Sequence, residues 1–187
     1  IRHGPIGESR LNQFDSRKPR GIVGVHRLVA GKGWLAAVAE TWWSAEQALA
    51  AVSPTFSVGE RPETQRIDRV LEEALRFGDA SRLHEAGDPQ TYLYEDFSHA
   101  ARYGAAGALH GTVETASATA RFHNGMLELW IGSQAPDAAL RAVAQALDLN
   151  ERDVTLYPMP AGGSFDRRLE NDHAIEVALI ASDVGRP

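Results

Sequence analysis

The chain carries at residues 157–170 the sequence YPMPAGGSFDRRLE, in which a strand pattern is followed by a glycine pair and then by a helix pattern. The residues from Val154 onward indicate a short strand, and Asp172 with the apolar run 174–181 indicates a helix with acidic residues at its start. Free main-chain N–H groups at the start of a helix suit an anion or an electron-rich oxygen. The stretch therefore predicts either a bend that holds a ligand or a glycine turn of purely steric origin.

The composition restricts the classes of function. The chain has 187 residues, 43% of them hydrophobic and 24% charged, which is typical of a folded globular protein. A net charge of -6 argues against nucleic acid as a partner, because binding a phosphate backbone requires a basic surface. Without cysteine, the chain can form neither a disulfide nor an iron-sulfur cluster. No apolar stretch approaches the roughly 20 residues that span a bilayer, so we expect no membrane span in this segment.

Two strands and a helix are predicted near the start of the chain. The apolar runs at residues 22–25 and 34–39 indicate strands, separated by turn residues at 31–33. Ser44 and Gln47 then have the spacing of a capping box, which predicts a helix from that point. The apolar residues of this helix share one face: Ala45, Ala48, Leu49 and Val52.

A second amphipathic helix is predicted over residues 62–77, in which Glu72 and Arg76 are spaced to form an ion pair. Its apolar residues follow the i, i+3, i+4 pattern: Ile67, Val70, Leu71, Ala74 and Leu75. Residues 78–92 are rich in turn formers and have little periodicity, which favours a boundary between structural parts there.

A tight hairpin is predicted at Asn124-Gly125, because both residues accept positive φ and apolar segments at 115–122 and 126–133 flank them. Alternation predicts that Leu127, Leu129 and Ile131 face one side of this hairpin. Pro136 then opens a helix whose apolar face comprises Leu140, Val143, Ala144 and Leu147. This part of the chain is therefore a layered α+β structure.

The order of hairpin, turn, helix, strand and glycine loop resembles the large molybdopterin-binding subunit of the xanthine dehydrogenase and aldehyde oxidase family. It is most similar to the isoquinoline 1-oxidoreductase beta-subunit branch. That branch has a Leu-Glu-x-Trp strand and a Thr-Gln-x-Pro turn, which LELW at 127–130 and QAP at 134–136 match, and a Gly-Gly-Gly-Phe-Gly-Arg-Arg loop, which GGSFDRR at 162–168 resembles. Residues 34–49 are similar to the end of the family's α/β hammerhead domain.

The resemblance implies an α+β fold in three parts. These are the C-terminal part of a hammerhead-like domain at 1–58, a helical linker at 59–92, and the N-terminal part of a molybdopterin-binding domain at 93–187. The chain would then be a segment of a longer protein, and the family's general-base glutamate would lie downstream of it. We therefore expect no catalytic residue of the family here, and we expect the isolated chain to be inactive and free of molybdenum.

The resemblance also assigns the cofactor contacts. Gln134 would hydrogen-bond the apical oxo group of molybdenum, Phe165 would lie beside the substrate pocket, and the main-chain N–H of Asp166 would approach the same oxo ligand. The other residues expected to contact the cofactor belong to the same loop: Gly162, Gly163, Ser164, Arg167 and Arg168. Ser164 and Asp166 replace glycines of the family pattern. An Asp166 side chain turned inward would repel the cofactor, whereas one turned toward Arg167 or Arg168 would not.

The implied reaction of the full-length parent is the oxidation of an aldehyde or N-heterocycle with oxygen derived from water. The implied partners are the remainder of the large subunit, an iron-sulfur small subunit that takes the electrons, and a small-molecule substrate. Members of this branch often carry a twin-arginine leader, so a periplasmic parent is expected, with the cytoplasm as the other location.

A second interpretation is a non-catalytic anion-binding or assembly module, in which the glycine bend is structural. Ser164 and Asp166, which depart from the family pattern, support it. Under either interpretation, Trp42-Trp43 is expected to supply one core anchor and one interface residue.

Some polar residues near the loop have structural interpretations. His110 and Glu114 are four residues apart, but side chains at that spacing in a strand are too far apart to share a metal, so a supporting role is favoured. Adjacent arginine side chains diverge, so at most one of Arg167 and Arg168 is expected to reach a phosphate. The other is expected to pair with Glu170, with Asp172 or with a neighbouring domain.

Overall fold

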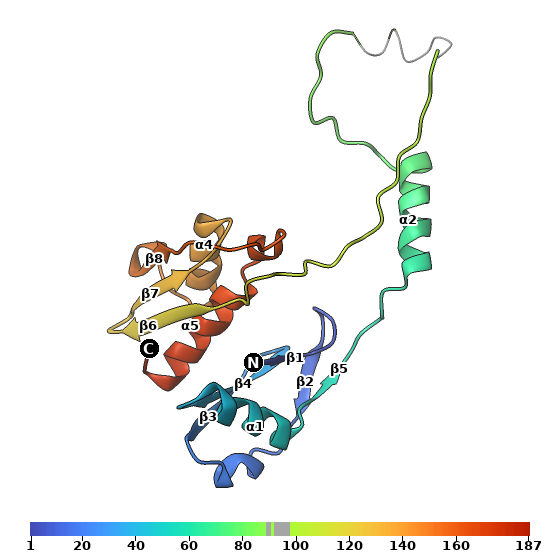
Figure 1. The fold of residues 1–187 in the computed structure, drawn as a ribbon. Coiled ribbons are helices and arrows are strands. Elements are labelled where there is room, and N and C mark those ends of the chain that lie inside the picture. The colour runs from blue at the N-terminus through green and yellow to red at the C-terminus, as the bar shows by residue number, and fades with distance from the viewer. Residues whose placement is uncertain (89–90, 92–97) are drawn as a thin grey trace. The chain divides into compact units, whose positions relative to one another are not determined.

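The computed structural model describes residues 1–88, 91 and 98–187, which divide into two compact units (Figure 1). One unit comprises Ile1–Gly59 together with Leu109–Pro187, and the other comprises Glu60–Ala108. The larger unit therefore joins two stretches that are far apart in the sequence.

The first sheet of the larger unit is antiparallel and has the strand order β1-β4-β3. Its strands are β1 (Arg2–His3), β3 (Val25–Ala30) and β4 (Trp34–Ala39), so the strand predicted at 34–39 is confirmed. The strand predicted at 22–25 is displaced, because Gly24 has φ 81 and forms a turn, and the strand begins only at Val25.

Three short elements complete this region of the larger unit. Strands β2 (Arg10–Gln13) and β5 (Thr55–Ser57) form a separate antiparallel pair, and a 3-10 helix η1 spans Lys18–Gly21.

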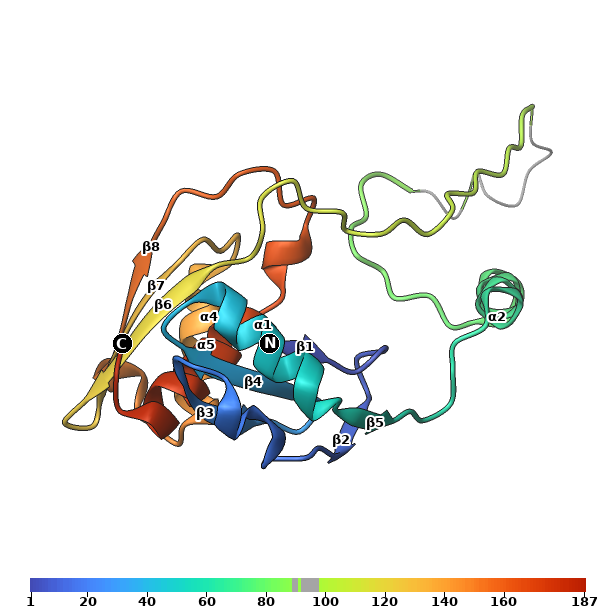
Figure 2. The same cartoon turned by 60° about the horizontal axis from the view of Figure 1, so that its bottom comes forward.

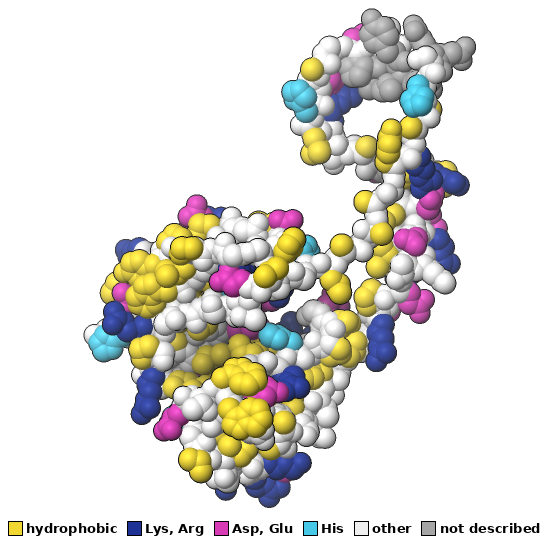
Figure 3. Space-filling model, in the orientation of Figure 1, with side chains coloured by type: hydrophobic (Ala, Val, Ile, Leu, Met, Phe, Trp, Pro, Cys, Tyr) yellow, Lys and Arg dark blue, Asp and Glu magenta, His cyan; other side chains and the backbone are white. Residues whose placement is uncertain are grey.

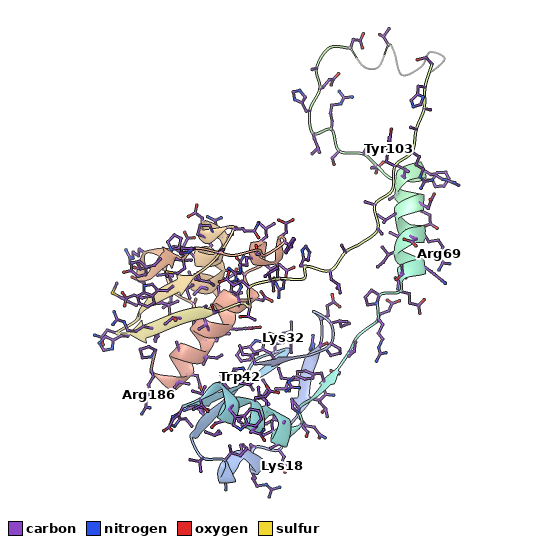
Figure 4. The ribbon with its side chains drawn as sticks, in the orientation of Figure 1. Lys18, Lys32, Trp42, Arg69, Tyr103 and Arg186 are labelled. Carbon is purple, nitrogen blue, oxygen red and sulfur yellow. The ribbon has the colours of Figure 1, made fainter. Side chains whose placement is uncertain are left out.

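Helix α1 (Trp42–Val52) begins earlier than the capping-box pattern predicts. Thr41 is the cap, since its Oγ1 accepts a hydrogen bond from the N–H of Ser44 at 3.1 Å, and Ser44 therefore lies inside the helix. Both tryptophans fall in the exposed first turn, where Trp42 is 75% and Trp43 62% exposed, and they contribute to a hydrophobic patch over α1 (Figures 3 and 4). The expectation that one of them anchors the core is wrong.

The second sheet of the larger unit has the order β6-β7-β8. Strands β6 (Ala118–His123) and β7 (Met126–Ile131) form the predicted hairpin, with φ 51 at Asn124 and φ 76 at Gly125. Strand β8 (Val154–Pro158) runs parallel to β7 and is reached through α4 (Pro136–Ala146) and the 3-10 helix η2 (Glu151–Asp153). The hairpin, the helix at Pro136 and the strand at Val154 are thus confirmed.

Helices α4 and α5 (Asp172–Val184) cover one face of the second sheet (Figures 1 and 2). The sheet contributes Leu127, Leu129 and Ile131 to this core, as the alternation predicts. The side of α5 that faces the sheet is made of small residues: Ala174, Ala178 and Ala181. On the opposite face of the sheet, Trp130 stacks on Tyr157 with ring centroids 5.1 Å apart.

Helix α5 also packs against the first sheet. Leu179, Ile180 and Val184 contact the cluster of Val29, Trp34 and Ala36. A hydrogen bond and an ion pair reinforce this contact: His3 Nε2 lies 2.7 Å from Glu176 Oε1, and Arg27 Nε lies 2.8 Å from Asp183 Oδ2. Burial raises the pKa of Glu176, and the hydrogen bond from His3 opposes that rise. A single helix therefore belongs to both cores.

The smaller unit contains the predicted amphipathic helix as α2 (Thr64–Phe77), in which Arg76 pairs with Glu72 at 3.8 Å. None of its side chains is buried in the described part of the chain. The boundary predicted at 78–92 extends over positions 89, 90 and 92, which lie outside the described residues. No helix within the described ranges has the length and apolar character needed to cross a bilayer.

Shortening Leu129 to alanine tests the core of the second sheet. Leu129 is fully buried, so Leu129→Ala should lower the free energy of unfolding by about 2–5 kcal/mol through lost burial and a residual cavity. Urea denaturation of the chain measures this change. Met126→Ala is the matched control on the same strand, because Met126 is exposed, and a loss of similar size in both variants would contradict the assigned core.

Candidate functional site

The loop between β8 and α5 turns at Phe165-Asp166. These two residues have φ 47 and φ 63, in the left-handed region, whereas the glycine pair does not have positive φ. A 3-10 helix η3 (Arg167–Leu169) follows, and α5 begins only at Asp172. The glycine pair is therefore followed first by η3 and only then by the helix indicated in the sequence, which begins at Asp172.

Gln134 is held against this loop by main-chain contacts. Its N–H donates to the carbonyl of Arg168 at 3.1 Å. The neighbouring Ser133 hydroxyl donates to the same carbonyl at 3.5 Å and accepts from the N–H of Ala135 at 3.0 Å. The turn between β7 and α4 and the loop before α5 are consequently brought together, although they are about 30 residues apart in the sequence.

The side-chain amide of Gln134 contacts both residues that replace family glycines. The hydroxyl of Ser164 donates to Gln134 Oε1 at 2.8 Å, and Gln134 Nε2 donates to Asp166 Oδ1 at 3.3 Å. Ser164 is 9% exposed, whereas Gln134 and Asp166 are exposed. The Asp166 carboxylate thus points toward Gln134 and not toward Arg167 or Arg168.

The first glycine of the pair, Gly162, has a structural explanation in its contact with Glu114. The N–H of Gly162 donates to the Glu114 carboxylate, and a Cβ at Gly162 would lie 2.8 Å from Glu114 Oε2. The carbonyl of Gly163 accepts from the N–H of Val113 at 3.0 Å. Residues 113–114 therefore run beside the loop, and a side chain at Gly162 would obstruct this contact.

Arg168 is buried beneath the site. Its side chain is 4% exposed, and its Nη2 lies 3.0 Å from Glu114 Oε2 and 3.5 Å from the carbonyl oxygen of Thr115. A Cβ added at Gly132 would stand 2.7 Å from Arg168 Nη1, so the guanidinium packs directly on that glycine. The charge of Arg168 is neutralised inside the protein.

Arg167 is paired as well. Its guanidinium binds Glu170 at 2.8 Å and Asp172 through two contacts, one of them 3.1 Å long. The pKa of Asp172 is lowered well below its ordinary value, by the adjacent His173 and by Arg167, against the opposing effect of partial burial. The His173 ring nitrogen lies 3.6 Å from the carboxylate, so the guanidinium makes the closer contact.

The predicted supporting role of His110 and Glu114 agrees with their contacts. His110 Nδ1 hydrogen-bonds the carbonyl of Phe165, and Glu114 binds Gly162 and Arg168. Within the described residues, no group of three or more His, Asp or Glu side chains could hold a metal ion. Sequence reasoning missed Thr115, which belongs to no recognisable motif. It placed Ser133 in the turn with Gln134 but assigned it no contact.

The main-chain N–H of Asp166 has no hydrogen-bond partner among the described residues. It belongs to the same exposed corner as Phe165, which is 62% exposed, and as the amide of Gln134. These two donors suit an electron-rich oxygen, as a molybdenum cofactor would provide, although the Asp166 carboxylate occupies one of them. Gln134 and the N–H of Asp166 would fit such a group once the Asp166 carboxylate turns away from Gln134.

The larger unit is an α+β structure in which the buried Arg168 lies under an exposed loop that carries hydrogen-bond donors. The family model described as "molybdopterin cofactor-binding domain" matches residues 76–187, which is more than half of the chain. The chain belongs to this family.

Two known proteins are similar to the chain. A membrane-bound aldehyde dehydrogenase (pyrroloquinoline-quinone) of Gluconacetobacter polyoxogenes is 27% identical over 190 residues, which cover 95% of this chain and 24% of that protein. The crystal structure of quinoline 2-oxidoreductase from Pseudomonas putida 86 matches with a TM-score of 0.58 and 18% identity, over 98% of this chain and 29% of that one. The chain thus spans about a quarter of the length of the curated relative, and the structural match supports the fold.

Replacing Arg168 tests the support beneath the loop. Arg168→Met keeps the aliphatic stem but removes the guanidinium, so we expect a loss of about 2–4 kcal/mol in the free energy of unfolding. Arg121→Met is the matched control, because Arg121 forms an exposed ion pair with Glu128 and should contribute less than about 1 kcal/mol. Denaturant unfolding measures both changes, and equal losses would contradict the structural role of Arg168.

The lowered pKa of Asp172 gives a prediction about acid stability. A carboxyl group whose folded pKa is depressed contributes stability above its unfolded value of about 3.9, and this contribution is lost as pH falls toward the folded pKa. Asp172→Asn should therefore be less stable than wild type near pH 7, and the difference should shrink as pH falls from about 5 to 2.5. Urea denaturation across this range measures it. A difference that stays constant down to pH 2.5 would contradict the assignment.

Proposed function

We propose that this chain is a segment of the large subunit of a molybdenum hydroxylase, in which Gln134 and the Phe165-Asp166 corner form the part of the cofactor site that the chain contributes. The observation that carries the proposal is the meeting of the Gln134 amide with this corner, through Ser164 and Asp166 at 2.8 and 3.3 Å. Membership in the molybdopterin-binding family supports it. We further propose that residues 1–58 are part of a hammerhead-like domain, that 59–92 form a linker and that 93–187 begin the cofactor-binding domain.

When bound, the molybdenum cofactor supplies the two-electron oxidation of the substrate with oxygen drawn from water. The residues of this chain would position the cofactor and polarise its electron-rich oxygen. The Gln134 amide and the N–H of Asp166 would donate to an electron-rich oxygen of the cofactor, and fixed donors of this kind need no reorganisation during the reaction. The exposed ring of Phe165 forms an apolar wall beside the substrate.

The arginines of the loop serve the same site indirectly. Arg168 holds the loop from beneath through Glu114, and Arg167 ties η3 to the start of α5 through Asp172. Because both guanidinium groups already have carboxylate partners, we assign them to loop geometry and place the direct cofactor contacts at Gln134 and Asp166. This assignment is compatible with the expectation that at most one of the two arginines reaches a phosphate, and it leaves neither of them in that role.

The proposed substrate of the parent enzyme is an aldehyde or an N-heterocycle, and the proposed partners are the remainder of the large subunit and an iron-sulfur subunit. The two similar proteins are named for an aldehyde and for quinoline, which supports this pair of substrate classes. The first of these names also specifies pyrroloquinoline quinone, a different cofactor. Elemental analysis of the purified full-length protein, together with extraction of bound quinone, separates the two cofactors; quinone without molybdenum would overturn the proposal.

Replacing Gln134 tests its role in the full-length polypeptide that contains this chain. Gln134→Ala removes one preorganised donor, so turnover per bound molybdenum should fall roughly 10²- to 10³-fold. Gln145→Ala is the matched control, since Gln145 is an exposed glutamine on α4 away from the loop. Unchanged turnover in a folded Gln134→Ala protein would instead favour the non-catalytic binding or assembly module.

A further inference from the structure

Gln134 meets two side chains where the family pattern has glycine. Ser164 is buried and donates its hydroxyl proton to Gln134 Oε1 at 2.8 Å. Asp166 is exposed and accepts from Gln134 Nε2 at 3.3 Å. The amide of Gln134 therefore has a protein partner at each end.

These two contacts determine which end of the amide faces the corner. An ionised carboxylate only accepts hydrogen bonds, so it requires the Nε2 end of Gln134, whereas the hydroxyl of Ser164 can either donate or accept. A flipped amide would place Oε1 against the Asp166 carboxylate, and two oxygen acceptors would repel each other. The donor end of the amide is thus directed toward Asp166.

We propose that Asp166 is an internal competitor of the cofactor: its carboxylate occupies the Gln134 donor that an electron-rich cofactor oxygen would otherwise engage. Ser164 binds the opposite end of the same amide, at Oε1. This inference rests on the proposed function, because that function supplies the competing oxygen.

Competition follows from the position of the carboxylate. Asp166 Oδ1 lies within hydrogen-bonding distance of Gln134 Nε2, where an incoming acceptor must also approach. Two electron-rich oxygens at such close range repel each other, so the Asp166 side chain must turn away before the cofactor binds this donor. The exposed side chain can do so by rotation about χ1, without a change of the main chain. The hydrogen bond to Gln134 that is lost when Asp166 turns away weakens retention of the cofactor.

The test uses Asp166→Asn and Asp166→Gly in the full-length polypeptide. Both residues adopt the left-handed conformation at φ 63 readily, so the turn should be preserved while the charge is removed. The release of molybdenum is followed by elemental analysis during dialysis. We expect both variants to release molybdenum roughly three- to tenfold more slowly than wild type, which corresponds to one displaced hydrogen bond.

Two controls test whether the slower release of molybdenum is specific to Asp166 and acts through Gln134. Asp137→Asn removes an exposed carboxylate in the first turn of α4 and should release molybdenum at the wild-type rate. In a Gln134→Ala background, the gain from Asp166→Asn should disappear. A gain that survives in that background would overturn competition through Gln134.

The remaining outcomes separate this inference from the proposed function. If the wild-type protein contains molybdenum but both Asp166 variants release it at the wild-type rate, the competitor role is wrong and the proposed function stands. A wild-type protein without molybdenum would overturn both. Slower release in both variants, abolished by Gln134→Ala, supports the inference.

Discussion

Arg168 joins three separate stretches of the chain at the candidate site. Its guanidinium binds Glu114 and the carbonyl of Thr115 and packs on Gly132. The main-chain carbonyl of Arg168 accepts a hydrogen bond from the N–H of Gln134. A charged group that is buried this fully requires partners, because burying it unpaired would be strongly unfavourable. These partners fix the position of the loop, and the loop in turn fixes the position of Gln134. The geometry at the exposed corner thus depends on a charge pair beneath it.

Helix α5 connects this local arrangement to the rest of the larger unit. Its alanine side packs on the second sheet, and Leu179, Ile180 and Val184 pack on the first sheet. Arg167 ties η3 to the start of this helix through Asp172. The loop therefore stands on an element that is held from both sides, which limits how far the corner can shift relative to either sheet. Rigid support of this kind is what a site built from main-chain donors requires.

Local signals predicted much of this fold from the sequence. Asn124-Gly125 specified the hairpin, and Pro136 and the apolar spacing specified α4, because both depend on neighbouring residues only. The left-handed turn at Phe165-Asp166 was not predictable, since Phe rarely adopts positive φ and a single Asp is only a weak signal for it. The family resemblance correctly predicted that Gln134 lies beside the loop. The partner of Arg168, however, is a glutamate more than 50 residues earlier in the sequence, and no spacing rule connects the two. The orientation of Asp166 toward Gln134 likewise depends on tertiary packing.

The larger unit is interrupted in the sequence by Glu60–Ala108, and this interruption has a thermodynamic consequence. The entropy lost on closing a flexible excursion grows only logarithmically with its length, so doubling the excursion costs about 0.6 kcal/mol. Insertions and deletions between Gly59 and Leu109 should thus be nearly neutral for the larger unit. By contrast, one additional carbon at Gly132 meets the guanidinium of Arg168 at 2.7 Å. The polypeptide can therefore vary widely in length at one place while it tolerates almost no added volume at another.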